Sequence, residues 1–196
     1  MRTMPALSMS MPITEPTGWR RWLAQAEAGD AATFEQMVEV HAALVLRTAQ
    51  RLLLSEADAQ DAAQEVFLKL HRFASKFDRT RDLRPWLYRM TVNVCHDLRR
   101  KRKLNVALDD AAEPAASEPT PEERWSAEEQ RQVLFQALAM LSDREREAIV
   151  LRDLEGLTTA EVGEAMGTTE ATIRSQIAMG RAKLKEYLAV RMRRRV

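Results

Sequence analysis

The chain has 196 residues, of which 45% are hydrophobic and 30% charged, with 6 Gly and 7 Pro. This length suits one domain or two small ones, and the scarcity of Gly, Pro and aromatic residues favours long helices over a large sheet. The single cysteine, Cys95, excludes an intrachain disulfide, and no stretch approaches the roughly 20 apolar residues of a membrane span. We therefore expect an all-α cytoplasmic protein with no membrane contact of its own.

The formal net charge of +1 hides three blocks of opposite sign. Residues 89–103 hold six Lys or Arg and one Asp, and residues 181–196 hold seven Lys or Arg and one Glu. Between them, residues 104–123 hold six acids and no base. Two basic blocks that flank an acidic one indicate nucleic-acid contacts at separate places on the chain.

In the N-terminal half, we expect residues 1–17 to form a flexible tail and residues 19–28 a first helix. Apolar residues at steps of three and four predict a second helix over 31–54. Ser55 is a suitable cap for a third helix that ends near Phe73, and 75–82 is a polar loop. Pro85 suits the first turn of a fourth helix, which should end in the basic run 99–103.

Residues 104–121 are acidic and rich in Pro and Ala, which predicts a linker between two small helical domains. The following unit contains two capping boxes, Ser142 with Glu145 and Thr158 with Glu161. The first box should open a helix that reaches Leu154, and the second a short helix that ends near Met166.

The stretch "GTTEATIRSQIAMGRAKL" (167–184) has the proportions of the second half of a helix-turn-helix. Gly167 makes the turn, Thr169 caps the last helix, and Ile173 and Ile177 point inward. The outer face then carries small, polar and basic side chains that suit base edges and phosphates in a major groove. The alternative is a helical hairpin with a solvated face.

In the N-terminal half, Asp58, Asp61 and Glu65 lie three and four residues apart and form an acidic stripe opposite the apolar face of their helix. Such a stripe is usually a solvated surface. Trp86, Tyr88 and Asn93 then precede the basic run, and aromatic and basic residues together suit single-stranded nucleic acid. Trp86 at a helix start is more often a core residue, so we leave it out of the site.

Three stretches in this order, "DAQDAAQEVFLKL", "RPWLYRMTVNVCHDLRRKRK" and "LSDREREAIVLRDLEGLTTAEVGEAMGTTEATIRSQIAMGRAKL", resemble the sigma-70 family of bacterial RNA polymerase specificity subunits. The size of two small domains matches the extracytoplasmic-function (ECF) subfamily. The resemblance extends over about residues 19–188. It implies sigma region 2 at 18–103, a helix-turn-helix region 4 at 122–191, and a short basic tail at 192–196.

The resemblance also implies partners and sites. Core RNA polymerase would bind through its β′ clamp helices and β flap, promoter DNA would be read and melted, and an anti-sigma factor would control the protein. The implied polymerase contacts are Asp58, Asp61, Gln64 and Glu65. The implied −10 contacts are Lys76, Arg79, Arg81, Arg84, Arg89, Asn93, His96, Arg99 and Arg100. The implied −35 contacts are Thr169, Ala171, Thr172, Arg174, Ser175, Ala178, Met179 and Arg181.

This sequence departs from the family where Gln176 and Met179 replace residues that are commonly basic, so the −35 sequence it reads should differ. Two other functions were weighed. A LuxR-type regulator shares the helix-turn-helix but needs a receiver or ligand-binding domain with strands, and a nucleic-acid enzyme needs clustered carboxylates or metal ligands. We expect no cofactor and no catalytic residues, because Asp109 and Asp110 have no partner carboxylates. We expect no metal, because Cys95 and His96 face different sides of a helix and the chain has no second cysteine.

Overall fold

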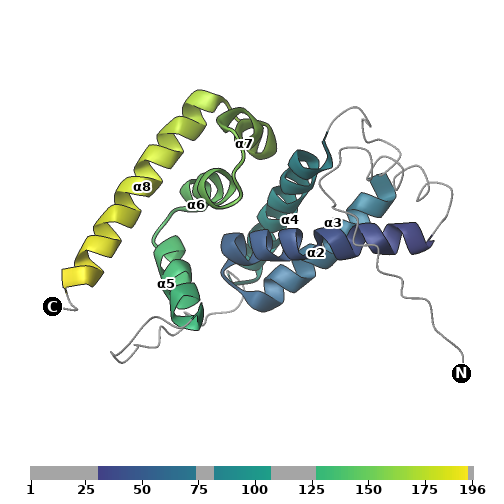
Figure 1. The fold of residues 1–196 in the computed structure, drawn as a ribbon, viewed down its shortest axis with the longest axis horizontal. Coiled ribbons are helices and arrows are strands. Elements are labelled where there is room, and N and C mark those ends of the chain that lie inside the picture. Colours follow the sequence, from purple (N-terminus) through teal and green to yellow (C-terminus); the bar gives the residue numbers. More distant parts are fainter. Residues whose placement is uncertain (1–30, 74–81, 107–126, 194–196) are drawn as a thin grey trace, which may run out of the picture.

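The computed structural model describes residues 31–73, 82–106 and 127–193, and within these ranges every regular element is helical (Figure 1). The elements are α2 (Ala31–Leu53), α3 (Glu56–Phe73), α4 (Leu83–Val106), α5 (Ala127–Ala139), α6 (Asp143–Ile149), a π-helical segment η2 (Val150–Leu154), α7 (Thr159–Met166) and α8 (Glu170–Arg193).

Helices α2, α3 and α4 pack on one another and form the N-terminal unit. Helix α2 ends where Leu54 takes a left-handed conformation (φ 57°), with its amide donating to the Gln50 carbonyl at 2.8 Å. Ser55 Oγ then accepts a hydrogen bond of 3.3 Å from the amide of Asp58, which satisfies one free donor at the start of α3. Val66 and Leu70 of α3 and Leu87 of α4 are fully buried, as the periodicity predicts.

The C-terminal unit is held by its caps and by one close helix crossing. Both predicted capping boxes are present, at Ser142 before α6 and at Thr158 before α7. Gly167 ends α7 in the left-handed region (φ 63°), which lets the chain reverse into α8. A side chain at Gly180 of α8 would place its Cβ only 2.8 Å from Cγ1 of Ile149, so glycine allows α8 to lie directly against α6.

The predicted helix 142–154 is not one regular helix. After Ile149 the backbone widens into η2, where the amide of Glu155 donates to the Val150 carbonyl at 3.0 Å, five residues back. The amide of Leu157 reaches the Leu151 carbonyl at 3.0 Å, and Gly156 (φ 79°) turns the chain toward α7. Sequence periodicity gave no sign of this change.

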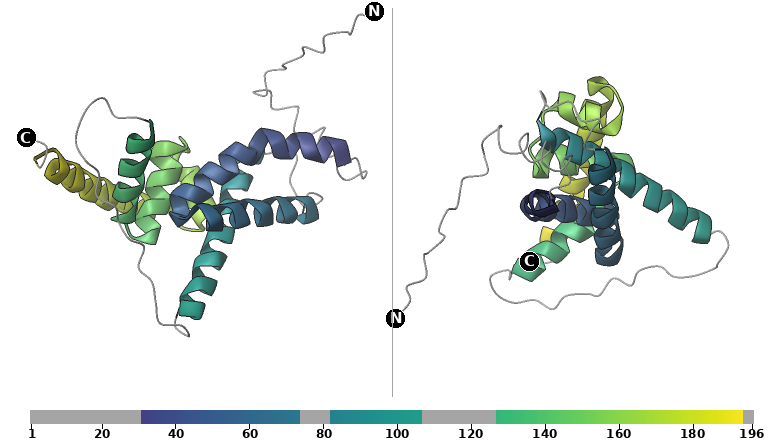
Figure 2. Two further views of the ribbon diagram at one scale, coloured as in Figure 1. Left: turned by 90° about the horizontal axis from the view of Figure 1, so that it is seen from below. Right: turned by 90° about the vertical axis from the view of Figure 1, so that its right-hand side faces the viewer.

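The two units do not stand apart. Helix α7 packs against α4, and α2 contacts both α6 and η2, so the C-terminal unit rests on the N-terminal one (Figures 1 and 2). A single cluster of buried apolar side chains runs through both units. The linker predicts two domains but no contact between them, and the packed arrangement is a finding of the structure.

Most element bounds agree with the sequence-based expectations. Helices α2 and α3 begin and end within a residue of prediction. Helix α4 continues to Val106, three residues past its predicted end, and α8 reaches Arg193, inside the predicted basic tail. The expected helix 19–28, the loop 75–82 apart from residue 82, and most of the linker lie outside the described residues.

Candidate nucleic-acid interface

Helix α8 presents a bare polar face at its N-terminal half. All eight residues expected to read the −35 element are exposed, while Ile173 and Ile177 are buried beneath them. Thr169 Oγ1 accepts a hydrogen bond of 3.3 Å from the amide of Thr172, which confirms Thr169 as a cap. This geometry fits the second helix of a helix-turn-helix, whose outer side is free to enter a major groove.

The two arginines of this face are held differently. Arg174 makes a 3.3 Å ion pair with Glu170 one turn earlier, and both side chains remain more than half exposed. Arg181 donates two hydrogen bonds to Asp153 of η2, at 2.6 and 3.0 Å, and this contact raises the pKa of its guanidinium. Arg174 is therefore free to turn toward a base, whereas Arg181 must leave or share a carboxylate to reach a phosphate.

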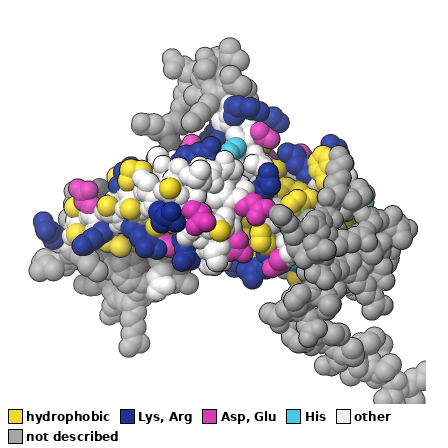
Figure 3. All heavy atoms as spheres, turned by 90° about the horizontal axis from the view of Figure 1, so that it is seen from above, with side chains coloured by type: hydrophobic (Ala, Val, Ile, Leu, Met, Phe, Trp, Pro, Cys, Tyr) yellow, Lys and Arg dark blue, Asp and Glu magenta, His cyan; other side chains and the backbone are white. Residues whose placement is uncertain are grey.

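The surface around α8 is mixed in chemistry. Figure 3 shows Lys and Arg side chains beside apolar ones at the end of the molecule formed by this helix. Met179, Leu188 and Val190 are among the exposed apolar residues. A duplex on this side would therefore meet apolar as well as charged contacts.

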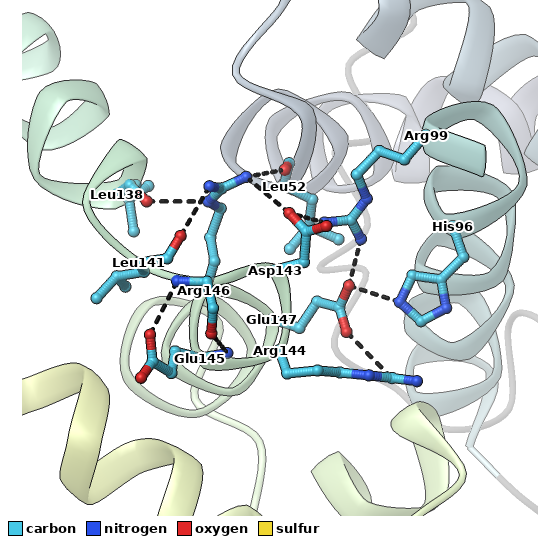
Figure 4. A network of polar contacts seen from close by, with 11 residues as sticks. Leu52, His96, Arg99, Leu138, Leu141, Asp143, Arg144, Glu145, Arg146 and Glu147 are labelled. Atoms are coloured by element: carbon cyan, nitrogen blue, oxygen red, sulfur yellow. Dashed lines mark hydrogen bonds and ion pairs between the residues drawn. The ribbon is translucent and has the colours of Figure 1, made fainter. Parts of the chain in front are cut away.

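The residues expected at the −10 strand are split between two environments. Lys76, Arg79 and Arg81 lie outside the described residues. On α4, the side chains of Arg84, Arg89, Asn93 and Arg100 are exposed. His96 and Arg99 are instead half-buried and face the C-terminal unit, where both contact the carboxylate of Glu147 (Figure 4).

The acidic stripe of α3 is open to solvent. Asp61, Gln64 and Glu65 are exposed, whereas Asp58 is half-buried and pairs with Arg102 at 2.7 Å. The exposed residues line an open groove of ≈ 300 Å³ between α3 and α4. Leu68, 57% exposed, also lines this groove and was missed by the sequence reasoning. Lys69 and Lys101 line the same groove, so its charge is mixed.

A cluster of polar side chains joins the two units, and the sequence analysis did not predict it. Glu147 is fully buried and lies 2.5 Å from His96 Nε2, with Arg99 and Arg144 as further partners (Figure 4). Beside it, Arg146 donates to the Leu138, Leu141 and Leu52 carbonyls at 2.9, 3.0 and 3.1 Å. The last of these bonds crosses from α6 to the C-terminal end of α2.

Glu155, directly after η2, makes a similar contact with α2. Its carboxylate, 1% exposed, lies 2.5 Å from Arg51 and 3.1 Å from Arg47, both on α2. Tyr88 of α4 donates a 3.0 Å hydrogen bond to the same group, and burial raises the pKa of this tyrosine to about 12. The buried carboxylates of Glu147 and Glu155 thus both pair with basic side chains of the N-terminal unit.

Neither a membrane span nor a metal site emerges from the described ranges. No helix there combines the length and the apolar character needed to cross a bilayer. No three His, Cys, Asp or Glu side chains there gather as metal ligands would. Cys95 is buried, and burial raises the pKa of its thiol to about 12.

Taken together, the turn at Gly167, the exposed polar face of the helix that follows it, and a basic helix with exposed Arg and Asn are features of a DNA-binding protein of the helix-turn-helix class. The family model for sigma-70 region 2 matches residues 37–104, and that for sigma-70 region 4 matches residues 131–184. The chain belongs to the sigma-70 family and, within it, to the ECF sigma factors. It is an alternative sigma factor of transcription initiation and not an enzyme.

Two relatives illustrate the match. The ECF RNA polymerase sigma factor SigE of Mycolicibacterium smegmatis is 33% identical over 181 residues, which cover 91% of this chain and 70% of SigE. The RNA polymerase sigma factor NccH of Alcaligenes xylosoxydans xylosoxydans is 31% identical, with 90% and 97% covered. A LuxR-type regulator is not supported, because the N-terminal unit matches sigma region 2.

Two solved structures share the fold. CnrH in complex with the cytosolic domain of CnrY has a TM-score of 0.64 at 25% identity and covers 88% of this chain and 98% of its own. The sigma factor RpoE of Bartonella quintana, in complex with the anti-sigma factor NepR, has a TM-score of 0.68 at 26% identity, with 80% and 97% covered.

Proposed function

We propose that this sigma factor docks on core RNA polymerase through α3 and reads a promoter through α4 and α8. The division of labour would be region 2 at 18–103, a linker at 104–121 and region 4 at 122–191. The observation that carries the proposal is the outer face of α8 opposite Ile173 and Ile177, where all eight residues expected to read DNA are exposed and Arg181 also pairs with Asp153 of η2.

Docking would use the acidic groove. Asp61, Gln64 and Glu65, with Asp58 at the edge, would meet the clamp helices of the polymerase β′ subunit around Leu68, while region 4 would meet the β flap. The exposed carboxylates of Asp61 and Glu65 would pair with basic residues of the partner, beside Lys69 and Lys101 of the same groove, and Leu68 would be buried. Binding to polymerase places the protein's action in the cytoplasm.

Promoter reading would follow from the two basic helices. The exposed side chains Arg89, Asn93 and Arg100 of α4 would hold the unpaired −10 strand, joined by His96 and Arg99 and by the residues before α4. Unpairing costs a few kcal/mol per flipped base, which contacts to the extruded strand offset. The similarity to the sigma factor RpoE, solved with the anti-sigma factor NepR, supports an anti-sigma partner for this chain as well.

The polymerase contact is tested by charge reversal. The double variant Asp61→Lys/Glu65→Lys should no longer co-purify with core polymerase, because it places two cations where a basic partner is expected. The matched control reverses Glu35 and Glu39, two exposed acids of α2. Undiminished binding of the first variant, with helicity intact by circular dichroism, would refute this contact.

The DNA contact is tested by two arginine variants on a duplex selected from a randomised pool. Arg174→Ala should cost about 1–3 kcal/mol and relax the preference at one base pair if Arg174 reads a guanine. Arg181→Ala should weaken all sequences alike and lower the salt slope by roughly one unit. Run-off transcription with core polymerase on a genomic promoter pool then identifies the promoters. If both variants bind as wild type does, α8 does not face DNA.

A further inference from the structure

We propose that Asp153 of η2 is a positioning residue for promoter binding. Its carboxylate holds Arg181 of α8 in the orientation in which the guanidinium donates to a phosphate of the −35 duplex. The inference rests on the proposed role of the outer face of α8 in binding DNA. It adds to that face a residue from outside the recognition helix, which the sequence analysis did not single out.

The contact between the two side chains is bidentate. Nη2 of Arg181 lies 2.6 Å from Oδ1 of Asp153, and Nε lies 3.0 Å from Oδ2. This side-on arrangement occupies the Nε donor and one donor of Nη2, and it does not use the donors of Nη1. The side chain of Arg181 is still 60% exposed. Arg181 can therefore donate to a phosphate from its outer end while it keeps the carboxylate of Asp153.

The close crossing of α8 and α6 fixes the place of Asp153 relative to Arg181. Gly180 allows this crossing, since a Cβ there would fall 2.8 Å from Cγ1 of Ile149. Ile149 is the last residue of α6, and Asp153 follows it by one further turn in η2. The packing that brings Gly180 onto Ile149 thus also brings Arg181, the next residue of α8, within reach of Asp153.

Arg174 shows what an arginine of this face looks like without such support. It lies on the same side of α8 as Arg181, because seven residues of an α-helix make almost two full turns. Its partner, Glu170, belongs to the same helix, and both side chains are more than half exposed. Exposed pairs of this spacing are weak, so Arg174 stays mobile. The partner of Arg181 is only 27% exposed and comes from another element, so the fold itself orients Arg181.

Two effects of Asp153 on DNA binding oppose each other. An arginine loses rotamer freedom when it is fixed at an interface, and this loss lowers the affinity. Asp153 imposes most of the loss in the free protein, before DNA arrives. The opposing effect is repulsion between the carboxylate and the phosphate, which would lie on different sides of the guanidinium and be screened at physiological salt. We expect the first effect to be the larger one, so Asp153 should tighten binding.

The experiment compares Asp153→Asn with a matched control, Glu186→Gln, in the full chain. Both variants remove one negative charge from region 4, and Glu186 is an exposed residue of α8. Affinity is measured by fluorescence anisotropy for the selected duplex and for a duplex of scrambled sequence, at about 0.15 M salt. Charge alone predicts that both variants bind DNA more tightly than wild type does. The sign of the change therefore separates positioning from charge.

We expect Asp153→Asn to weaken binding to both duplexes by about three- to tenfold, whereas Glu186→Gln should bind at least as tightly as wild type. In the Arg181→Ala background, Asp153→Asn should cause no further loss, because the residue that it positions is gone. Arg181→Lys should keep the salt slope of wild type but lose affinity, because an ammonium lacks the planar fork that serves a carboxylate and a phosphate together. Helicity by circular dichroism should be unchanged in all variants.

Two results would overturn the proposal. One is an Asp153→Asn variant that binds DNA as tightly as Glu186→Gln does, because Asp153 would then not orient Arg181 for DNA. The other is an equal loss of affinity from Asp153→Asn with and without Arg181, because Asp153 would then act through the structure of region 4. Failure of the proposed function has a different signature, since neither Arg174→Ala nor Arg181→Ala would then change DNA binding.

Discussion

Replacing Arg146 by Met should destabilise the folded chain by about 3 kcal/mol. Arg146 is 8% exposed, and its guanidinium donates to three backbone carbonyls, those of Leu138, Leu141 and Leu52. A hydrogen bond to a charged group contributes about 1.5–3 kcal/mol, so three of them amount to roughly 4–9 kcal/mol. Part of this is offset, because burial of the cation is itself costly, as the lowered pKa of Arg146 indicates.

Methionine retains a long apolar stem, so little cavity is created and the change isolates the lost donors. Arg152→Met is the matched control, because half-buried Arg152 donates to a single carbonyl, that of Leu157, at 3.0 Å. It should cost about 1.5 kcal/mol, the low end of the range for one such bond, because the side chain is half-buried. The assay is denaturant unfolding followed by circular dichroism, and the Tm of Arg146→Met should fall by about 6–12 °C. If Arg146→Met lowers the free energy of unfolding no more than Arg152→Met does, the three hydrogen bonds of Arg146 do not stabilise the fold.

Three further results are expected. Gly163→Ala should lower the Tm although alanine favours helices, because its Cβ would lie 2.9 Å from the backbone oxygen of Thr168, and thermal unfolding checks this. The Cys95 thiol should resist a thiol reagent at mildly alkaline pH and react fully in concentrated guanidinium, because burial raises its pKa to about 12. Lys183 lowers the pKa of Glu145, so Glu145→Gln should be less stable than wild type above the unfolded-state pKa of the carboxyl. The difference should vanish as pH falls through the lowered folded-state pKa, in unfolding curves over acidic pH.

Local signals predicted the local structure well. Ser142 with Glu145 and Thr158 with Glu161 are reciprocal side-chain and backbone contacts within one turn, so their spacing alone identified both helix starts. Gly167 was recognisable in the same way. The outer face of α8 followed from Ile173 and Ile177, because residues one turn apart share a side and the remaining positions must face outward.

The contact between the two units could not be predicted in this way. Glu147 meets His96 and Arg99 across 51 and 48 residues of chain, and no local pattern encodes such a pairing. One signal was available: residues 148–151 are four consecutive apolar residues, and all four are buried. A helix that is apolar on every side is covered on every side. That apolar run indicates that α6 and η2 are packed on more than one side, but it does not identify the element that packs against them.

The π-helical segment η2 sets the direction in which Glu155 points toward α2. A π-turn holds one residue more than an α-turn, so it behaves as a single-residue insertion in an otherwise regular helix. Each residue of an α-helix turns the chain by about 100°, so without that extra residue Glu155 would point about a quarter of a turn or more away from Arg47 and Arg51. Capping boxes and apolar contacts within region 4 do not depend on where Glu155 points. The extra residue of η2 thus sets whether Glu155 reaches Arg47 and Arg51, which is one of several contacts between the two halves of this sigma factor.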